Sequence, residues 1–205
     1  MIEFIADFYN HPDTKTRIFH IAANLFSEKG YHQVSIREIC EIAKISKPTL
    51  YYYFENKRTL FLTLLEETDR ISEELINEFI DTEKGYVNKF HGLFRLHSVF
   101  LKRYPYFVKF FFVIHFMSLE NGLKEKVSKQ TRKKIQRLQA FIEKGQAEKY
   151  IAPDIDPFIL SISIFGSIRY LMLYHLKKLD SEFEIEKQLE QLFHFWKHNI
   201  FVKEN

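Results

Sequence analysis

The sequence predicts an all-α protein, in which an N-terminal helix-turn-helix domain of three helices is joined by a long helix to a C-terminal helical bundle. About nine helices are expected in total. The 205 residues include only 6 glycines and 5 prolines, too few turn residues for a β-sandwich or a β-barrel. Apolar residues recur with helical spacing in almost every segment. A hydrophobic content of 46% argues against a disordered chain.

The first two helices have recognisable ends. Residues 14–29 carry one apolar face, and Gly30 follows as a C-terminal stop. Ser35 and Glu38 have the spacing of a capping box, in which each side chain bonds the free backbone N–H of the other residue. We therefore expect a short second helix that begins after Ser35 and ends near Ala43.

The later helices follow from caps and breaks. Ser46 caps a third helix, and Pro48 lies in its first turn, where proline is tolerated. Asn56 caps a long fourth helix, in which apolar residues recur from Leu60 to Ile80. Glycines and prolines divide the rest into five more helices, expected near residues 86–103, 105–118, 123–148, 157–178 and 183–201.

The third helix has one face that suits DNA. Two short helices joined by a three-residue turn, after a longer supporting helix, are typical of a helix-turn-helix. Leu50 and Phe54 share the face that must pack on the first two helices. The outer face presents Lys47, Pro48, Thr49, Tyr51 and Tyr52. Amine and hydroxyl groups can donate to phosphates or base edges, and apolar surface can contact thymine methyl groups. The alternative is a solvated face whose tyrosines cover the core.

The charge of this region agrees with a nucleic-acid partner. Between Thr14 and Arg58 there are eight basic and four acidic residues, so the segment carries +4, against +3 for the whole chain. A basic patch on a helix-turn-helix is the electrostatic footprint expected for DNA binding.

Residues Thr14–Leu65 resemble the DNA-binding domain of the TetR family of transcriptional regulators. The resemblance rests on Leu25–Gly30 (LFSEKG) and on Ser46–Lys57 (SKPTLYYYFENK). It implies that Arg37 approaches DNA and that Lys57 grips a phosphate. It also places the residues of the outer face, Lys47, Pro48, Thr49, Tyr51 and Tyr52, in the major groove or on its flanking phosphates.

The resemblance implies two domains, with a helix-turn-helix DNA-binding domain at 1–55 and an effector-binding and dimerisation domain at 56–205. Two positions depart from the family pattern. Lys44 stands in the turn where members often have glycine, and a left-handed Lys44 costs about 1 kcal/mol. Pro48 also replaces a frequent glycine. Both departures leave the operator sequence open.

Phenylalanines dominate the second domain, and some of them are candidates for the wall of an effector pocket. The candidate residues are Phe90, Phe94, Phe107, Phe111 and His115. Ordinary core packing is the alternative, and the resemblance favours a pocket because the family's C-terminal domain encloses one. Few acidic residues fall between Phe90 and Leu119, whereas basic residues lie nearby. We therefore expect a small hydrophobic effector, long or flat, that is neutral or anionic.

A homodimer is expected from the last two helices. The segment Phe158–Leu176 is apolar on nearly every side, so one neighbouring helix cannot cover it. Small residues would let a partner helix approach closely. The predicted interface consists of Ser163, Gly166, Tyr170, Leu189, Leu192 and Trp196.

Several kinds of site are not expected. A single cysteine, Cys40, cannot form a disulfide within the chain or build a thiolate zinc site. His194 and His198 lie one turn apart without an evident third ligand, and no catalytic or cofactor motif is present, so we expect no enzyme, metal or cofactor. The basic run Lys124–Arg137 has the composition of a solvated face or of a site for an anionic head group. The segment Met1–Tyr9 is a poor signal peptide, so a cytoplasmic protein without a membrane span is expected.

The expected function is a homodimeric, ligand-responsive transcriptional regulator, most simply a repressor that a hydrophobic effector releases from double-stranded, palindromic operator DNA. Its two recognition helices would lie about 34 Å apart, in successive major grooves. The alternatives are a helical lipid or small-molecule carrier that retains a helix-turn-helix, and a regulator without a small-molecule effector.

Overall fold

A computed structural model describes residues 12–176 and 184–202 of this chain. Within those ranges there are nine α-helices and no strand, which confirms the all-α prediction. The segment Met1–Tyr9 lies outside the described residues. The described chain divides into two compact units, unit 1 with residues 12–71 and 104–127, and unit 2 with residues 72–103, 128–176 and 184–202. Both units therefore draw on residues after position 55, where the helix-turn-helix was expected to end.

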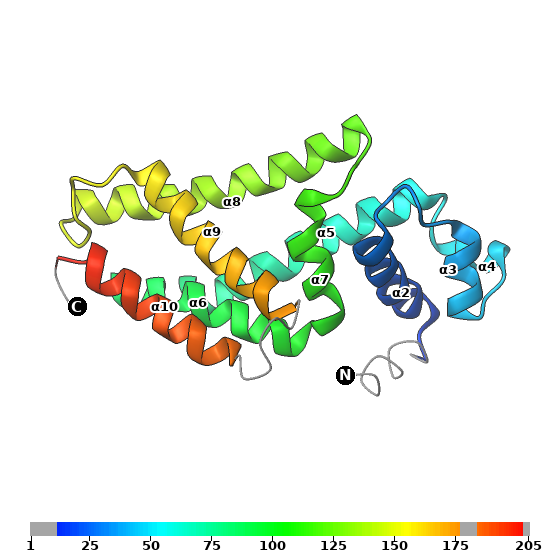
Figure 1. Cartoon of the computed structure of the whole chain (residues 1–205), viewed down its shortest axis with the longest axis horizontal. Coiled ribbons are helices and arrows are strands. Elements are labelled where there is room, and N and C mark those ends of the chain that lie inside the picture. The colour runs from blue at the N-terminus through cyan, green and yellow to red at the C-terminus, as the bar shows by residue number, and fades with distance from the viewer. Residues whose placement is uncertain (1–11, 177–183, 203–205) are drawn as a thin grey trace. The chain divides into compact units, whose positions relative to one another are not determined.

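Unit 1 contains the helix-turn-helix and a later helix that packs on it (Figure 1). Its elements are α2 (Thr14–Lys29), α3 (Ile36–Ala43), α4 (Lys47–Tyr53), the larger part of α5 (Lys57–Ile76), α7 (Pro105–Val113), the 3-10 helix η2 (Ile114–Phe116) and the beginning of α8 (Asn121–Ala147). α2 packs on both α3 and α7. Phe61 of α5 has edge-to-face ring contacts with Phe26 at 5.2 Å and with Phe110 at 5.5 Å. Aromatic rings of three helices thus form the centre of this unit.

The predicted caps of the short helices are present. The Ser35 hydroxyl accepts a hydrogen bond from the Glu38 N–H at 3.1 Å, and the Ser46 hydroxyl accepts one from the Thr49 N–H at 3.2 Å. Asn56 Oδ1 accepts from the Thr59 N–H at 2.9 Å. Lys44 is left-handed, with φ 53° and ψ 48°, as its place in the turn requires. These local bonds define where α3, α4 and α5 begin.

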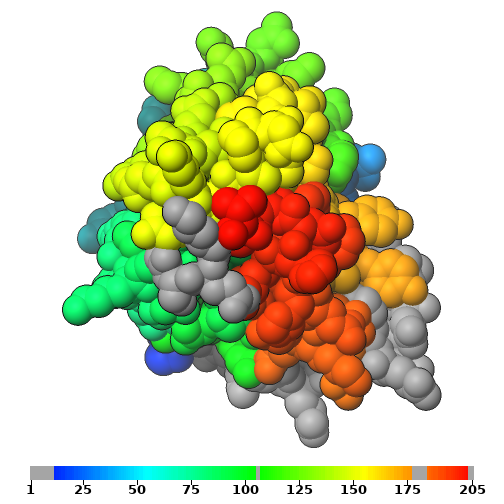
Figure 2. All heavy atoms as spheres, turned by 90° about the vertical axis from the view of Figure 1, so that its left-hand side faces the viewer, coloured from blue at the N-terminus to red at the C-terminus, as the bar shows by residue number. Residues whose placement is uncertain are grey.

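Unit 2 is a bundle in which α10 packs on α6 and α9. Its elements are the end of α5, the π-helix η1 (Asn77–Asp81), α6 (Tyr86–Arg103), most of α8, α9 (Pro157–Leu176) and α10 (Ile185–Ile200). Phe90, Phe94 and Phe193 form its aromatic centre, with ring distances of 5.2 to 6.1 Å. In the space-filling view, α10 and the later turns of α9, in red and orange, lie on one face (Figure 2).

The π-helical turn η1 interrupts the long helix that the apolar pattern predicted as continuous to Ile80. α6 passes directly against this turn at Gly92, where an added Cβ would lie 2.8 Å from the carbonyl carbon of Phe79 and closer still to its oxygen. Only a residue without a Cβ allows the two backbones to approach so closely.

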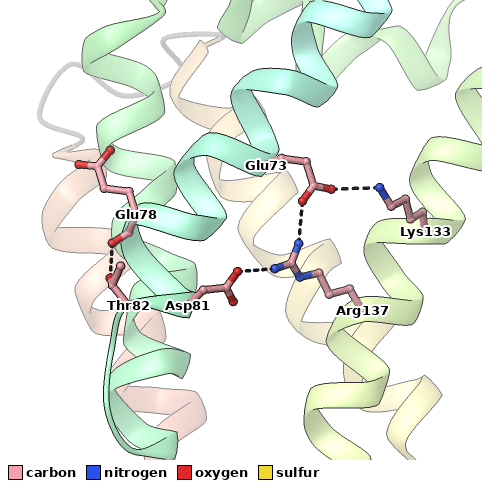
Figure 3. Close-up of polar contacts among 6 residues, drawn as sticks. All are labelled: Glu73, Glu78, Asp81, Thr82, Lys133 and Arg137. Carbon is pink, nitrogen blue, oxygen red and sulfur yellow. Dashed lines mark hydrogen bonds and ion pairs between the residues drawn. The ribbon is translucent and has the colours of Figure 1, made fainter.

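Three cations of the basic run of α8 have acidic partners. In unit 2, Glu73 accepts from Lys133 at 3.1 Å and from Arg137 at 2.8 Å, and Arg137 also reaches Asp81 at 2.8 Å (Figure 3). In unit 1, Lys126 pairs with Glu66 at 2.8 Å. These cations remain in contact with solvent, as expected of a solvated face, and all three also pair with acidic residues of α5 and η1.

Candidate nucleic-acid interface

Of the side chains on the short helix α4, one points into the core and the others point outward. Leu50 is completely buried, and Phe54, just after the helix, contacts the Phe19 ring at 5.3 Å. Tyr52 is 83% exposed, and Lys47 and Pro48 are also exposed. Thr49 is half-buried, with its hydroxyl 2.8 Å from that of Ser46. The sequence therefore assigned the inner and outer faces of this helix correctly.

Tyr51 and Tyr52 extend the outer face of α4 toward its C-terminal end. Both phenol rings are exposed, and the Tyr52 ring meets that of Tyr53 edge to face at 5.0 Å. The ring contact restricts Tyr52 without burying it. A face of one amine, one hydroxyl and two phenols can donate to phosphates and base edges.

Arg37 lies exposed on α3, where its Nε donates to Glu41 Oε1 at 2.7 Å, one helical turn away. The hydrogen bond and charge of Glu41 raise the pKa of Arg37. Arg37 therefore shares its exposed face with a carboxylate. Glu41 stands four residues after Arg37, so the sequence spacing alone could have revealed this pair.

Lys57 is directed to the protein's own backbone. Its Nζ donates to the carbonyl oxygens of Tyr31 and Val34, both at 2.9 Å, and lies 3.5 Å from that of His32. The ammonium also lies 4.5 Å from the centre of the Tyr31 ring. Burial lowers the pKa of Lys57. Sequence reasoning missed these contacts, because loop carbonyls leave no mark in the pattern of side chains.

A second cation holds the other end of α3. Arg17 Nε donates to the carbonyl oxygen of Ala43, the last residue of α3, at 3.1 Å. The cations at Lys29 and Arg58 have acidic partners in Glu38 and Glu120. Of the basic residues counted between Thr14 and Arg58, those exposed and without an acidic partner among the described residues are Lys15, Lys44 and Lys47.

The predicted pocket residues are divided between the two units. Phe90 and Phe94 are buried in unit 2, where they pack on Phe193. Phe107 is buried in unit 1, which also holds half-buried Phe111 and exposed His115. Among the residues that the structure describes, no group of three or more His, Cys, Asp or Glu side chains could hold a metal ion.

The predicted interface residues differ in exposure and fall into three groups. Ser163 and Gly166 are exposed on α9, and Tyr170 is 70% exposed. Leu189 of α10 is instead buried in the core of unit 2. The remaining two, Leu192 and Trp196, are half-buried, and the Trp196 indole N–H donates to the Ser167 hydroxyl at 3.2 Å.

The predicted interface left out several large exposed apolar side chains of unit 2. They include Phe158, Ile159 and Ile162 on α9 and Phe195 on α10. In the described part of the chain, α9 is also the one helix long and apolar enough to cross a membrane, by length and composition alone, and 28% of its apolar window is buried. α9 therefore buries one apolar face in unit 2 and exposes another.

Known DNA-binding regulators are similar in sequence to the segment that contains the helix-turn-helix. The family described as "Bacterial regulatory proteins, tetR family" matches residues 18–64. The transcriptional regulator UidR of Escherichia coli K12 is 40% identical over 52 residues, which are 25% of this chain and 26% of UidR. The match therefore spans about a quarter of the length of the curated relatives.

Solved structures are similar over nearly the whole chain. The fatty acid degradation regulator FadR of Bacillus halodurans is 19% identical, with a TM-score of 0.69 over 87% of this chain and 91% of FadR. AibR in complex with isovaleryl coenzyme A and operator DNA is 18% identical, with a TM-score of 0.71 over 94% of this chain and all of AibR. A Saccharomonospora viridis protein in complex with choline is 19% identical, with a TM-score of 0.75 over 92% and 98% of the two chains. At these identities the likeness shows a shared fold.

Proposed function

We propose that this chain, a TetR-family transcriptional regulator by its DNA-binding domain and its fold, is a homodimeric repressor that a hydrophobic effector releases from a palindromic operator. The observation that carries the proposal is the outer face of α4. It is exposed, carries Lys47 without an acidic partner among the described residues, and is held in place by a capped helix-turn-helix. Regulators of this family are DNA-binding proteins and not enzymes. Because the DNA of a bacterium lies in its cytoplasm, a regulator that binds this DNA works in the cytoplasm.

The recognition surface is assigned to α4 with one residue of α3. Lys47, Thr49, Tyr51 and Tyr52 enter the major groove, with Pro48 at its edge. Arg37 approaches the DNA together with its partner Glu41. Since the major groove presents a distinct pattern for each base pair, this face reads sequence as well as charge.

Dimerisation is supported by the apolar surface of α9 and α10. Large exposed apolar side chains in one place cost free energy in water unless a partner covers them. Nothing lies within 4 Å of the position of a Cβ on Gly166, so the surface is open there to a second helix. The simplest apolar partner for this face is the same face of a second copy of the chain, related by a two-fold axis. Such a dimer would present two recognition helices to a palindrome.

The effector is proposed to be hydrophobic and neutral or anionic. No acidic residue occurs from Phe90 to Leu119, whereas Arg95, Lys102, Arg103 and Lys109 lie in the same stretch. A buried cation would need a carboxylate partner. FadR is described as a regulator of fatty acid degradation, and AibR is seen with isovaleryl coenzyme A, whereas the S. viridis protein is seen with the cation choline. An effector that prefers the conformation with the wrong helix spacing would release the DNA.

A binding titration tests the proposal. Fluorescence anisotropy with DNA from upstream of the protein's own gene should show tight binding that weakens as salt is added. Lys47→Ala should weaken this binding, whereas Lys144→Ala removes the same charge from the part of α8 that belongs to unit 2 and should not. A folded protein without salt-sensitive DNA binding would instead support the helical carrier.

A further inference from the structure

The loop between α2 and α3 has carbonyl groups that no helix can satisfy. Tyr31, His32 and Val34 all direct their carbonyl oxygens to the Lys57 ammonium in the first turn of α5. An ammonium group has three N–H donors in a tetrahedral arrangement, so three acceptors use all of them. Lys57 therefore replaces the backbone partners that this loop lacks.

The same loop is anchored in the core by an aromatic ring. Tyr31 is buried, with its ring 5.0 Å from that of Phe61 and 5.8 Å from that of Phe26. The Lys57 ammonium lies over this ring at 4.5 Å, within the range of a cation–π contact. The Tyr31 ring and the loop carbonyls therefore contact the Lys57 ammonium from two sides and hold it against the loop.

The loop leads directly into Ser35, whose hydroxyl caps α3. At the other end of α3, the carbonyl of Ala43 is held by Arg17. Because α3 packs on α4, a shift in the start of α3 would also displace the outer face of α4. Two cations that donate to backbone carbonyls, Arg17 and Lys57, therefore hold the two ends of α3.

We propose that Lys57 is a positioning residue, which sets the start of α3 through the carbonyls of residues 31–34, and that it makes no phosphate contact. The proposal rests on the DNA-binding function proposed above and revises the role that family resemblance implies for Lys57. The phosphate-binding charge then belongs to exposed cations without acidic partners among the described residues, such as Lys47 and Lys44.

An arginine substitution separates the two roles. Arginine binds phosphate at least as well as lysine, through a planar fork of donors. That fork cannot donate to three carbonyls that converge on one nitrogen. If Lys57 binds a phosphate, Lys57→Arg should resemble the wild type, and if it binds the loop, Lys57→Arg should resemble Lys57→Met.

The experiment compares Lys57→Arg, Lys57→Met and the control Lys47→Met, at a temperature where each is fully folded by circular dichroism. We measure affinities for operator and random DNA over a range of salt concentrations, and amide hydrogen exchange in residues 31–36. Both Lys57 variants should exchange faster in that segment. Both should lose preference for the operator by about tenfold, the effect of removing one hydrogen bond to a charged group, at an unchanged salt slope.

The control should behave in the opposite way. Lys47→Met should lower the salt slope by about one unit, because the variant neutralises one phosphate fewer, and its amide exchange should match the wild type. Wild-type exchange in Lys57→Met would overturn the positioning role. So would a lower salt slope in Lys57→Met that Lys57→Arg restores. If the wild type itself shows no salt-sensitive DNA binding, the proposed function fails, and the exchange comparison still tests the loop contact.

Discussion

Within α4, an exposed residue proposed to contact DNA lies close to a residue of the core. Tyr52 is 83% exposed and has an edge-to-face contact with Tyr53, whereas Leu50 is completely buried. We expect Tyr52→Ala to leave the melting temperature unchanged and to weaken operator binding by about tenfold or more, since a good base contact contributes about 1–3 kcal/mol of discrimination. Differential scanning fluorimetry and anisotropy titrations with operator and random DNA measure the two effects.

The control for Tyr52 is Leu50→Ala, which should lose about 2–5 kcal/mol of folding free energy and lose DNA binding with it. If Tyr52→Ala bound operator and random DNA as the wild type does, Tyr52 would have no part in recognition.

His97 gives unit 2 a defined sensitivity to acid. It is buried on α6 with Nδ1 2.7 Å from the carbonyl oxygen of Leu93, and burial, opposed by that hydrogen bond and assisted by the charge of Lys134, lowers its pKa to about 4. The unfolded imidazole has a pKa near 6.5, so protons bind the unfolded state preferentially between these values. The stability that comes from keeping His97 neutral is therefore fully present above about pH 6.5. It is lost as the pH falls toward 4.

We expect His97→Phe, which has a similar volume and no titrating group, to flatten this dependence. The loss in the wild type should be on the order of 3 kcal/mol between pH 6.5 and 4. Urea denaturation at a series of pH values measures it. A variant that lost the same free energy as the wild type over that range would show that another group is responsible.

At the scale of elements, the π-turn η1 determines how closely α6 can approach α5. A Cβ on Gly92 would overlap the Phe79 carbonyl, whose atoms belong to backbone and cannot rotate away. We expect Gly92→Ala to cost about 1–3 kcal/mol or more of folding free energy, because α6 must shift away from η1. Urea denaturation measures the change.

The matched control is Gly122→Ala on α8. There the added Cβ would meet only the guanidinium end of Arg58, at 3.1 Å, and a long flexible side chain can move. This variant should be close to wild type. Equal stability of the two variants would mean that the approach of α6 to η1 is loose.

The same comparison shows what the sequence could predict about the elements. Caps at Ser35, Ser46 and Asn56 bond residues three positions away, so sequence spacing reveals them. The bonds from Lys57 to loop carbonyls and from Arg17 to Ala43 join residues 23–26 positions apart, and only tertiary structure brings them together. The π-turn leaves the apolar pattern almost unchanged, so periodicity alone extended the helix through it.

At the scale of the molecule, the faces of the C-terminal helices were harder to assign. α9 is apolar nearly all round, so its pattern could not tell the face that buries Ile164 and Ile168 from the face that exposes Ile159 and Ile162. On α10 the spacing placed Leu189 in an interface, whereas the protomer's own core uses it. A helix that is apolar nearly all round has no single polar side to reveal which face is buried.

The exposed face of α9 leads to the last prediction, which concerns assembly. Gly166 has open space around its Cβ position, so an arginine side chain fits within the folded protomer, while it would obstruct a partner helix packed there. We expect Gly166→Arg to remain folded and to sediment as a monomer at micromolar concentration. Gly166→Ala, which keeps the residue small, should remain a dimer.

Loss of the dimer should also weaken operator binding, because two linked recognition helices bind a palindrome with an avidity about 10²–10⁴ times that of one. The variant should therefore bind the full operator little better than a half-site, whereas the wild type should distinguish the two strongly. A Gly166→Arg protein that stays dimeric would show that the chain assembles through another face. A monomeric protein with wild-type operator affinity would instead show that one helix-turn-helix is sufficient for recognition.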